Sequence, residues 1–134
     1  MTTIEVRTRA RDDWVDITEE VQAAVRASGV RQGICFLWSL HTTCGLTVNE
    51  SADPDVAGDI ARTLARLVPR DDPGYRHVEE RNADAHIKTS LVGTHLSLPV
   101  ADGTLLLGTW QGVFLAEFDG PRRRRVAVRI LPTP

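Results

Sequence analysis

The sequence contains few aromatic residues, a single lysine and no long hydrophobic run. Aromatic side chains make up 5% of the 134 residues. The basic residues are fifteen arginines and one lysine, Lys88. No segment approaches the roughly 20 consecutive apolar residues that a membrane-spanning helix needs. The first residues show neither the basic region nor the apolar stretch of an export signal. We therefore expect a cytoplasmic protein with no membrane partner.

Cysteine content and net charge are also low. Two cysteines, Cys35 and Cys44, without an export signal are typical of free thiols in a reducing compartment. The formal net charge is −2, so the chain as a whole offers no attraction to nucleic acid. The basic run at 122–125 lacks interleaved aromatics, and its residues alternate between the two faces of an expected strand. We expect no nucleic-acid partner.

The chain does contain enough apolar sequence for one core. With 134 residues, 42% of them hydrophobic, it should bury roughly two thirds of the surface that its unfolded form exposes. No internal repeat and no linker rich in proline, glycine or serine divides it. The sequence predicts a single domain over residues 1–134.

Three segments begin with polar residues that can cap a helix. The expected helices are one capped by Asp16 or Thr18 and ended by Gly29, one that begins at Asp53-Pro54 and runs up to Pro69, and one capped by Asn82 and ended by Gly93. Their expected core-facing residues are Val21, Ala24 and Val25, then Val56, Ile60, Leu64 and Leu67, then Ala83, Ile87 and Leu91.

Alternating or short apolar runs predict strands in the rest of the chain. The expected strands cover residues 3–9, 34–38, 46–48, 96–100, 104–107, 112–118 and 123–130. Asp102-Gly103 and Asp119-Gly120 predict tight hairpin turns, so the second half would form an antiparallel meander. We expect an α+β fold, a β-rich sandwich of mainly antiparallel strands with about three helices.

A polar run between two expected strands is the first candidate site. Residues 41–53 gather an imidazole, hydroxyls, a thiol, an amide and two carboxylates. His41 and Glu50 favour a functional site, whereas Asp53 is equally well explained as the cap of the following helix. Cys44 beside a glycine is more typical of a packing residue than of a nucleophile.

The segment 82–90 is the second candidate site. On a helix, Asp84 and Lys88 are four residues apart and would pair on one face, while His86 and Ser90 would share another. Near the helix N-terminus the backbone dipole disfavours a protonated imidazole. We expect His86 to be neutral and able to bind a metal or accept a proton.

Histidine spacing gives no metal motif, because the four histidines form neither HxH nor HExxH. Two imidazoles with Glu50 or Asp53 would suit Zn²⁺, whereas carboxylates beside a phosphate would suit Mg²⁺, and spacing does not choose between them. Trp110, flanked by Gly108 and Gly112, would either stack on a ligand ring or fill the core.

Five long motifs follow one another along nearly the whole chain. They are His41-Thr-Thr-Cys-Gly-Leu-Thr-Val-Asn-Glu, Ala52-Asp-Pro-Asp, Asn82-Ala-Asp-Ala-His-Ile-Lys, Leu107-Gly-Thr-Trp-Gln and Glu117-Phe-Asp-Gly-Pro-Arg. In this order they resemble the YjbQ family. Cys44 stands where that family more usually has alanine, and Trp38 where a smaller aliphatic residue is expected. The resemblance implies a β-rich α+β subunit assembled as a homotrimer.

The resemblance also implies a secondary thiamine-phosphate synthase activity. This reaction couples a hydroxymethylpyrimidine pyrophosphate to a thiazole phosphate and releases pyrophosphate. It calls for a divalent metal at the leaving group, with Mg²⁺ the first choice and Zn²⁺ the alternative. The expected catalytic residues are His41, His86 and Lys88, the expected contacts to the phosphorylated small-molecule substrate are Thr42, Thr43, Asn49, Trp110 and Gln111, and the expected metal ligands are Glu50, Asp53, His41 and His86.

Two other functions fit the same polar residues. The first is a metal-dependent hydrolase of a phosphate or ester, in which histidine and carboxylate ligands would activate water. The second is a non-catalytic trimer that binds a small metabolite, with the polar cluster supporting the subunit interface.

Overall fold

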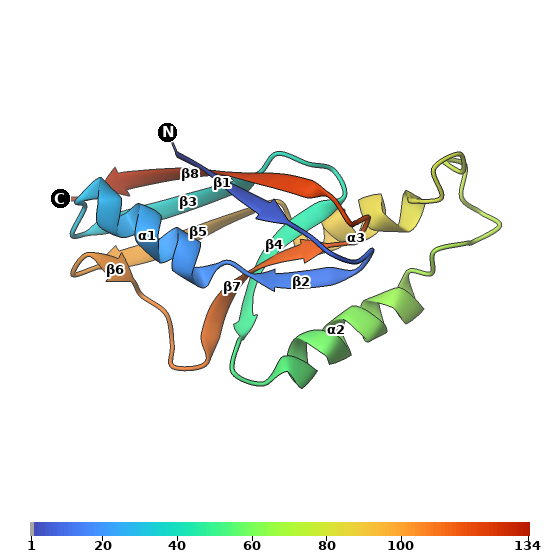
Figure 1. Ribbon diagram of the computed structural model, residues 1–134, viewed down its shortest axis with the longest axis horizontal. Coiled ribbons are helices and arrows are strands. Elements are labelled where there is room, and N and C mark those ends of the chain that lie inside the picture. The colour runs from blue at the N-terminus through green and yellow to red at the C-terminus, as the bar shows by residue number, and fades with distance from the viewer. Residues whose placement is uncertain (1) are drawn as a thin grey trace.

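The computed structural model describes residues 2–134 and contains eight strands and three helices (Figure 1). In chain order the elements are β1 (Thr2–Arg7), β2 (Asp13–Asp16), α1 (Thr18–Ser28), β3 (Gly33–Ser39), β4 (Cys44–Glu50), α2 (Pro54–Leu67), α3 (Ala83–Val92), β5 (His95–Ala101), β6 (Thr104–Leu105), β7 (Gln111–Glu117) and β8 (Arg123–Pro132). The α+β class and the three helices are as predicted. No helix within these residues is both long and apolar enough to cross a membrane.

The strands form two antiparallel sheets. The larger sheet has the order β1-β8-β3-β5-β6, and the smaller has the order β2-β7-β4. Both sheets contribute to one core, in which Leu37 and Val126 of the larger sheet pack with Leu46 and Leu115 of the smaller. Helix α1 lies across the strands and adds Val21 and Val25 to the same core, as its apolar spacing predicts. The predicted β-rich sandwich is confirmed.

One of the two predicted hairpins is present and the other is not. Asp102 and Gly103 both adopt positive φ, 53° and 80°, and join β5 to β6 in the turn that an Asp-Gly pair favours. Asp119-Gly120 instead carries the chain from β7 in the smaller sheet to β8 in the larger. The predicted meander is therefore wrong, because β7 pairs with β2 and β4, and β8 pairs with β1 and β3.

Helix α2 starts as predicted but buries none of its residues. The Asp53 carboxylate accepts a hydrogen bond from the Asp55 backbone N–H, and Pro54 occupies the first turn. The apolar residues of α2 are gathered on one side of the helix, as predicted, yet Leu67 at the end of this stripe is 72% exposed. In Figure 1, α2 lies beside the smaller sheet, and its Leu64 packs against the cluster of Ala85, Ala116 and Phe118. The apolar stripe of α2 is therefore half-buried at Val56, Ile60 and Leu64 and exposed only at Leu67.

Helix α3 presents a different face to the interior from the one predicted. Ile87 and Leu91 are exposed, whereas Asp84 and Lys88 are buried. The reason is an interior charge network: the Lys88 Nζ and Arg11 Nη2 atoms each lie within hydrogen-bond distance of the Asp84 carboxylate, at 2.9 and 2.8 Å. A buried charge is tolerated when it is paired in this way. Of the predicted apolar face of α3, Ala83 is buried as expected, whereas the prediction is wrong for Ile87 and Leu91.

The N-terminus of α3 also departs from prediction. Asn82 occupies the capping position but its side chain makes no capping hydrogen bond.

The other end of α3 is as predicted, because Gly93 ends the helix at a φ of 103°. Beside it, the Gly93 carbonyl accepts from Leu46 N at 3.0 Å, and a Cβ on Gly45 would approach that carbonyl oxygen to 2.6 Å. Glycine at position 45 thus lets β4 lie directly against the end of α3.

Candidate functional site

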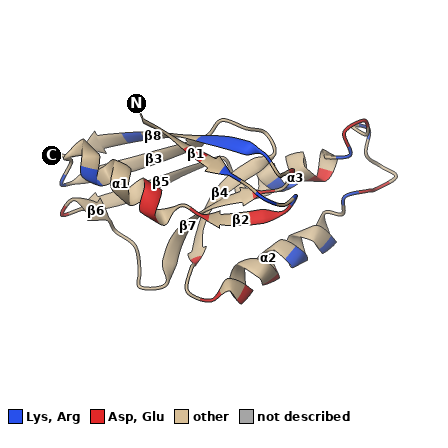
Figure 2. Ribbon diagram, in the orientation of Figure 1, with Lys and Arg blue, Asp and Glu red and all other residues tan. Residues whose placement is uncertain are grey.

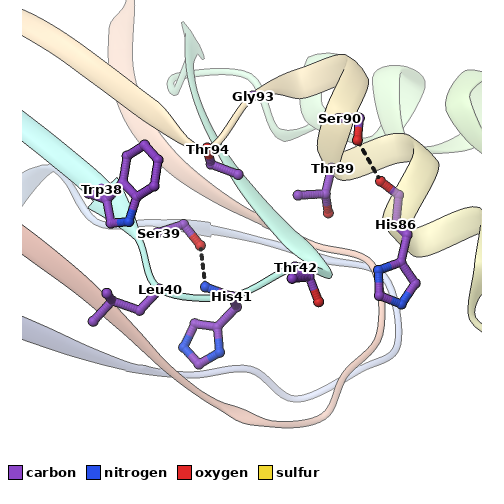
Figure 3. Close-up of a pocket in the computed structure, with 10 residues that line it drawn as sticks. All are labelled: Trp38, Ser39, Leu40, His41, Thr42, His86, Thr89, Ser90, Gly93 and Thr94. Carbon is purple, nitrogen blue, oxygen red and sulfur yellow. Dashed lines mark hydrogen bonds between the residues drawn. The ribbon is translucent and has the colours of Figure 1, made fainter.

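Two hollows meet where the loop between β3 and β4 faces α3. The first, which we name the neutral compartment, has a volume of about 710 Å³, and the second, the charged compartment, about 410 Å³. Leu40, His41, Thr42 and His86 line both. Figure 3 shows His41 and Thr42 on the loop with His86 and Thr89 on the helix across from them. The close approach of β4 to the end of α3 brings together two motifs that are distant in the sequence.

The lining of the neutral compartment contains no aspartate, glutamate, lysine or arginine. Beyond the four shared residues it is lined by Trp38, Ser39, Thr89, Ser90, Gly93 and Thr94. Trp38 supplies an aromatic wall, and the threonines and serines supply hydroxyl groups. Thr89 is 3% exposed, and its hydroxyl oxygen has no hydrogen-bond partner within the described residues. A buried hydroxyl is rarely left unpaired, so the Thr89 hydroxyl is open to a further hydrogen bond.

The charged compartment carries both signs of charge. It adds Thr43, His77, Glu80, Asn82, Asp119, Arg122 and Arg124 to the four shared residues. Figure 2 shows the basic residues gathered at the start of β8. The Arg122 guanidinium pairs with Asp119 at 3.2 Å and is half exposed, so it faces solvent rather than the core. This half of the site can bind an anion such as a phosphate.

His41 is held as a neutral imidazole. Its Nε2 atom accepts a hydrogen bond from the Arg125 backbone N–H at 2.8 Å, so in this state Nε2 carries no proton. Burial lowers the pKa of His41, and the neighbouring Arg124 guanidinium lowers it further. The neutral ring therefore carries its proton on Nδ1 and offers a hydrogen-bond donor.

A buried ion pair fixes the loop that carries His41. Arg124 and Glu117 are both almost fully buried, and the Arg124 guanidinium binds both Glu117 carboxylate oxygens, with the Nε to Oε1 contact at 2.7 Å. The same guanidinium donates to the Thr43 hydroxyl at 2.8 Å, and the Thr8 hydroxyl donates to Glu117 at 2.7 Å. This network ties β8, β7 and loop 40–43 together.

His86 lies across the site from His41 and is less constrained. Its ring makes no hydrogen bond within residues 2–134, and it meets the ring of His77 edge-on, with 5.1 Å between centroids and 89° between planes. His86 therefore keeps both ring nitrogens for a ligand. Both predicted histidines line one site, together with the predicted Thr42 and Thr43.

The remaining predicted residues lie elsewhere. Lys88 is 2% exposed, binds Asp84 and lies over the Phe118 ring, so it does not line either compartment. Asn49, Glu50 and Gln111 lie at the other end of the paired strands β4 and β7. Seven extended residues separate that end from the start of β4, a span of roughly 20 Å.

Trp110 and Asp53 belong to the same distant end. Trp110 is 62% exposed, so the alternative in which it fills the core is wrong. Asp53 and Glu50 line a separate acidic groove with Asp12, Asp13 and Asp16. The four residues predicted as one set of metal ligands are thus divided between two places. Within residues 2–134, no three histidine, cysteine, aspartate or glutamate side chains converge on a common point where they could hold a metal ion.

Cys44 has the surroundings of a packing residue. It is fully buried, and burial raises the pKa of its thiol, although a contact to the Ser39 hydroxyl at 3.4 Å acts in the opposite direction. A thiol with a raised pKa is a poor nucleophile at neutral pH.

Sequence reasoning missed several residues that line the site, namely Trp38, His77, Asn82, Thr89, Asp119 and Arg122. Asn82, Asp119 and Arg122 stand inside two of the motifs that carry the family resemblance, and that position was an available signal. His77 stands in an irregular segment with no motif, so only its place in space reveals it.

Comparison with known proteins shows which family the chain resembles. The family model described as "UPF0047 protein YjbQ-like" matches residues 2–133. The UPF0047 protein MJ1081 of Methanocaldococcus jannaschii is 47% identical over 127 residues, which cover 95% of this chain and 91% of that protein. The UPF0047 protein YugU of Bacillus subtilis is 41% identical and covers 96% of this chain and 97% of its own length.

Solved structures of similar sequence share the fold over nearly the whole chain. An uncharacterized YjbQ/UPF0047 family protein from Clostridium acetobutylicum superposes with a TM-score of 0.94 at 44% identity, covering 98% of this chain and all of that one. The conserved hypothetical protein TT1486 from Thermus thermophilus gives 0.91 at 50% identity, with the same coverage. The chain belongs to the YjbQ (UPF0047) family.

Proposed function

We propose that this protein is a thiamine-phosphate synthase of the secondary type that the family resemblance implies. The thiazole nitrogen attacks the methylene carbon of the pyrimidine pyrophosphate. A C–N bond forms, the C–O bond breaks, and the electron pair leaves with pyrophosphate. The protein has to hold two heterocycles and stabilise the leaving anion.

The observation that carries this proposal is the junction of the two compartments at His41 and His86. A neutral compartment with an aromatic wall and hydroxyl groups suits a heterocycle with ring nitrogens and an amino group. A charged compartment beside it suits a phosphate or pyrophosphate group. The two histidines lie where the ring and the phosphate of one substrate would join.

Three groups would stabilise charge on the leaving pyrophosphate. The Nδ1–H of His41 is a donor held in place by the Arg125 contact. Arg122 contributes a partly exposed guanidinium, and His86 contributes a ring with free nitrogens. Donors fixed before the reaction stabilise developing charge more effectively than mobile water does. Mg²⁺ would arrive with the pyrophosphate, because Glu50 and Asp53 line another groove.

Trp38 takes the stacking role that sequence reasoning gave to Trp110. It walls the neutral compartment and is 44% exposed. Phe36 and His95 stack against it, with ring centroids 6.4 and 6.1 Å from that of Trp38. An open aromatic face supported in this way suits a flat ring.

We also propose that the protein assembles as a homotrimer. Ile34, Phe36 and Trp38 alternate along the outer face of β3, and Leu131 of β8 pairs with Ile34. Ile34, Trp38 and Leu131 are each more than two fifths exposed, and an apolar patch of this kind is typical of a subunit contact. Because Trp38 belongs both to this face and to the neutral compartment, the site would lie at the edge of the interface. The two free thiols fit the expected cytoplasmic location.

The test is turnover by the purified protein with both thiamine precursors and Mg²⁺. We expect thiamine phosphate to accumulate, and we expect His41→Gln and His86→Gln each to lower kcat by at least tenfold, by loss of a donor to the leaving group. Val78→Ala, at an exposed position outside both compartments, is the control. Unchanged turnover in both histidine variants would remove the proposed site. Release of phosphate without coupling would favour the hydrolase.

A further inference from the structure

The Asn82 side chain does not cap α3, although it lies at the capping position. Asn82 is 3% exposed and occupies the N-cap position directly before α3, yet its side chain makes no capping hydrogen bond. Its amide nitrogen instead donates to an Asp119 oxygen at 2.9 Å, and its amide oxygen lies 3.0 Å from Nε2 of His77. Asparagine at this position usually stabilises the helix, so the diversion indicates another role.

The donor and the acceptor of each hydrogen bond can be assigned in turn from Asp119 through Asn82 to His77. The Asp119 carboxylate forms an ion pair with the Arg122 guanidinium, so its oxygens act as acceptors. The Asn82 amide nitrogen must then face Asp119, which leaves the amide oxygen for His77. Because an amide oxygen also only accepts, His77 must carry a proton on Nε2. In the neutral ring, Nδ1 is left as an acceptor.

His77 is therefore the counterpart of His41 in the charged compartment. His41 accepts through Nε2 and presents Nδ1–H, a donor, whereas His77 donates through Nε2 and presents Nδ1, an acceptor. Both rings line the same hollow of about 410 Å³. The His86 ring lies edge-on to His77, and the Arg81 guanidinium binds Asp71 through two hydrogen bonds, which anchors the segment that carries His77.

We propose that His77 is a further substrate-binding residue, whose Nδ1 accepts a hydrogen bond from a protonated phosphate oxygen, with Asn82 and Asp119 as positioning residues. The second proton of a phosphate monoester dissociates with a pKa of about 6, so a protonated form is available near neutral pH. A hollow with one fixed donor and one fixed acceptor matches a group that carries both O⁻ and O–H. This inference rests on the proposed function, because it specifies how the charged compartment recognises phosphate.

The first measurement needs no variant. In ¹⁵N spectra of the histidine rings of the wild-type protein at neutral pH, we expect His77 in the Nε2–H form and His41 in the Nδ1–H form. His77→Ala and His41→Ala assign the two sets of signals. A His77 ring in the Nδ1–H form would overturn the inference and would leave the synthase proposal untouched, since turnover does not enter this measurement.

The second measurement is a titration with inorganic phosphate. We expect the Nδ1 signal of His77 to shift on binding, and we expect His77→Ala and Asn82→Ala each to weaken phosphate binding by about tenfold, the usual scale for one lost hydrogen bond to a charged group. Val78→Ala, next to His77 and 58% exposed, is the matched control and should bind as the wild type does. In Asn82→Ala the ring of His77 should show a mixture of both tautomers.

Two results would overturn the inference. One is a phosphate titration that moves the signals of His41 or His86 while those of His77 stay in place. The other is phosphate binding of wild-type strength by His77→Ala. Phosphate binding that shifts His77 in a protein without synthase turnover would support the inference while contradicting the proposed reaction. If Asn82→Ala fails to fold, the exposed His77→Ala variant still decides the matter.

Discussion

The Nε2 atom of His41 lies 2.8 Å from the backbone nitrogen of Arg125 and accepts its hydrogen bond. The contact links the loop after β3 to β8, and it is broken when the ring takes up a second proton. Burial and the nearby Arg124 guanidinium both lower the pKa of His41. The folded state therefore binds this proton less readily than the unfolded state, in which the pKa of histidine is about 6.5.

The first prediction concerns pH. Because the pKa of His41 is lower in the folded state, its contribution to stability is present above the unfolded pKa and is lost as pH falls through the folded pKa. We expect the Tm of the wild type to exceed that of His41→Gln by more at pH 7.5 than at pH 5. Thermal unfolding of both proteins at both pH values measures this. An equal difference at the two pH values would contradict it.

The second prediction concerns the buried pair of Glu117 and Arg124. Glu117→Gln leaves the guanidinium inside the core without its counter-ion, which should cost about 3–5 kcal/mol of unfolding free energy. Replacing both residues, as Glu117→Leu with Arg124→Met, removes the unpaired charge and should cost less than the single change. Urea unfolding of the two variants makes the comparison. A double variant that is less stable than the single variant would contradict this prediction. It would show that the ion pair stabilises the folded state more than apolar side chains do at the same two positions.

The third prediction separates stability from turnover at Lys88. Burial alone would raise the pKa of Asp84, but hydrogen bonds from Arg11 and Lys88 hold it below its ordinary value. Lys88→Met removes one of these two donors, so we expect a loss of about 1–3 kcal/mol in unfolding free energy. Because the Lys88 ammonium does not line either compartment, kcat measured well below the Tm should stay unchanged. A large loss of kcat in a folded Lys88→Met protein would contradict this prediction and would support a direct role of Lys88 in turnover.

The fourth prediction tests the proposed subunit contact. Leu131 and Ile34 are partners across β8 and β3 and are both exposed, and neither lines a compartment. In the proposed trimer a charge there has to be buried when subunits meet, so Leu131→Asp should dissociate the assembly. Sedimentation velocity measures the change. Leu91→Asp, at an exposed position on α3, is the control and should remain a trimer. An intact trimer in Leu131→Asp would place the interface on another surface.

The fifth prediction uses the distance between the two ends of β4. Glu50 is at the end opposite to the site, so Glu50→Gln should leave turnover unchanged if one chain forms the whole site. Assays at saturating substrate and Mg²⁺ test this. Loss of turnover would mean that this end of one chain completes the site of a neighbouring subunit.

Several sequence predictions succeeded because they depend on local chemistry. Asp53-Pro54 begins α2, Gly29 ends α1 at a φ of 71°, and Asp102-Gly103 turns β5 into β6. Each of these signals acts through the conformation of one or two residues. The alternation predicted for the basic run is also present, with Arg124 buried and Arg123 and Arg125 exposed.

Other predictions failed where distant residues decide the outcome. Asp119-Gly120 has a hairpin signal, but β7 and β8 pair in different sheets. Helix α3 turns Lys88 inward because Asp84 and Arg11 compensate its charge, and spacing within the helix cannot reveal Arg11. Asn82 leaves its capping role because His77 and Asp119 lie within reach.

The sequence by itself determined the α+β class, the ends of the helices, the family and the two motifs that contribute His41 and His86. Only the tertiary structure decided which polar residues share a site. Glu50 is nine residues from His41 in the sequence but lies at the far end of an extended strand, while His86 is 45 residues away and lies across the same hollow. The physical reason is that an extended strand separates its ends by roughly 3.3 Å per residue, whereas sheet and helix packing brings remote segments into contact.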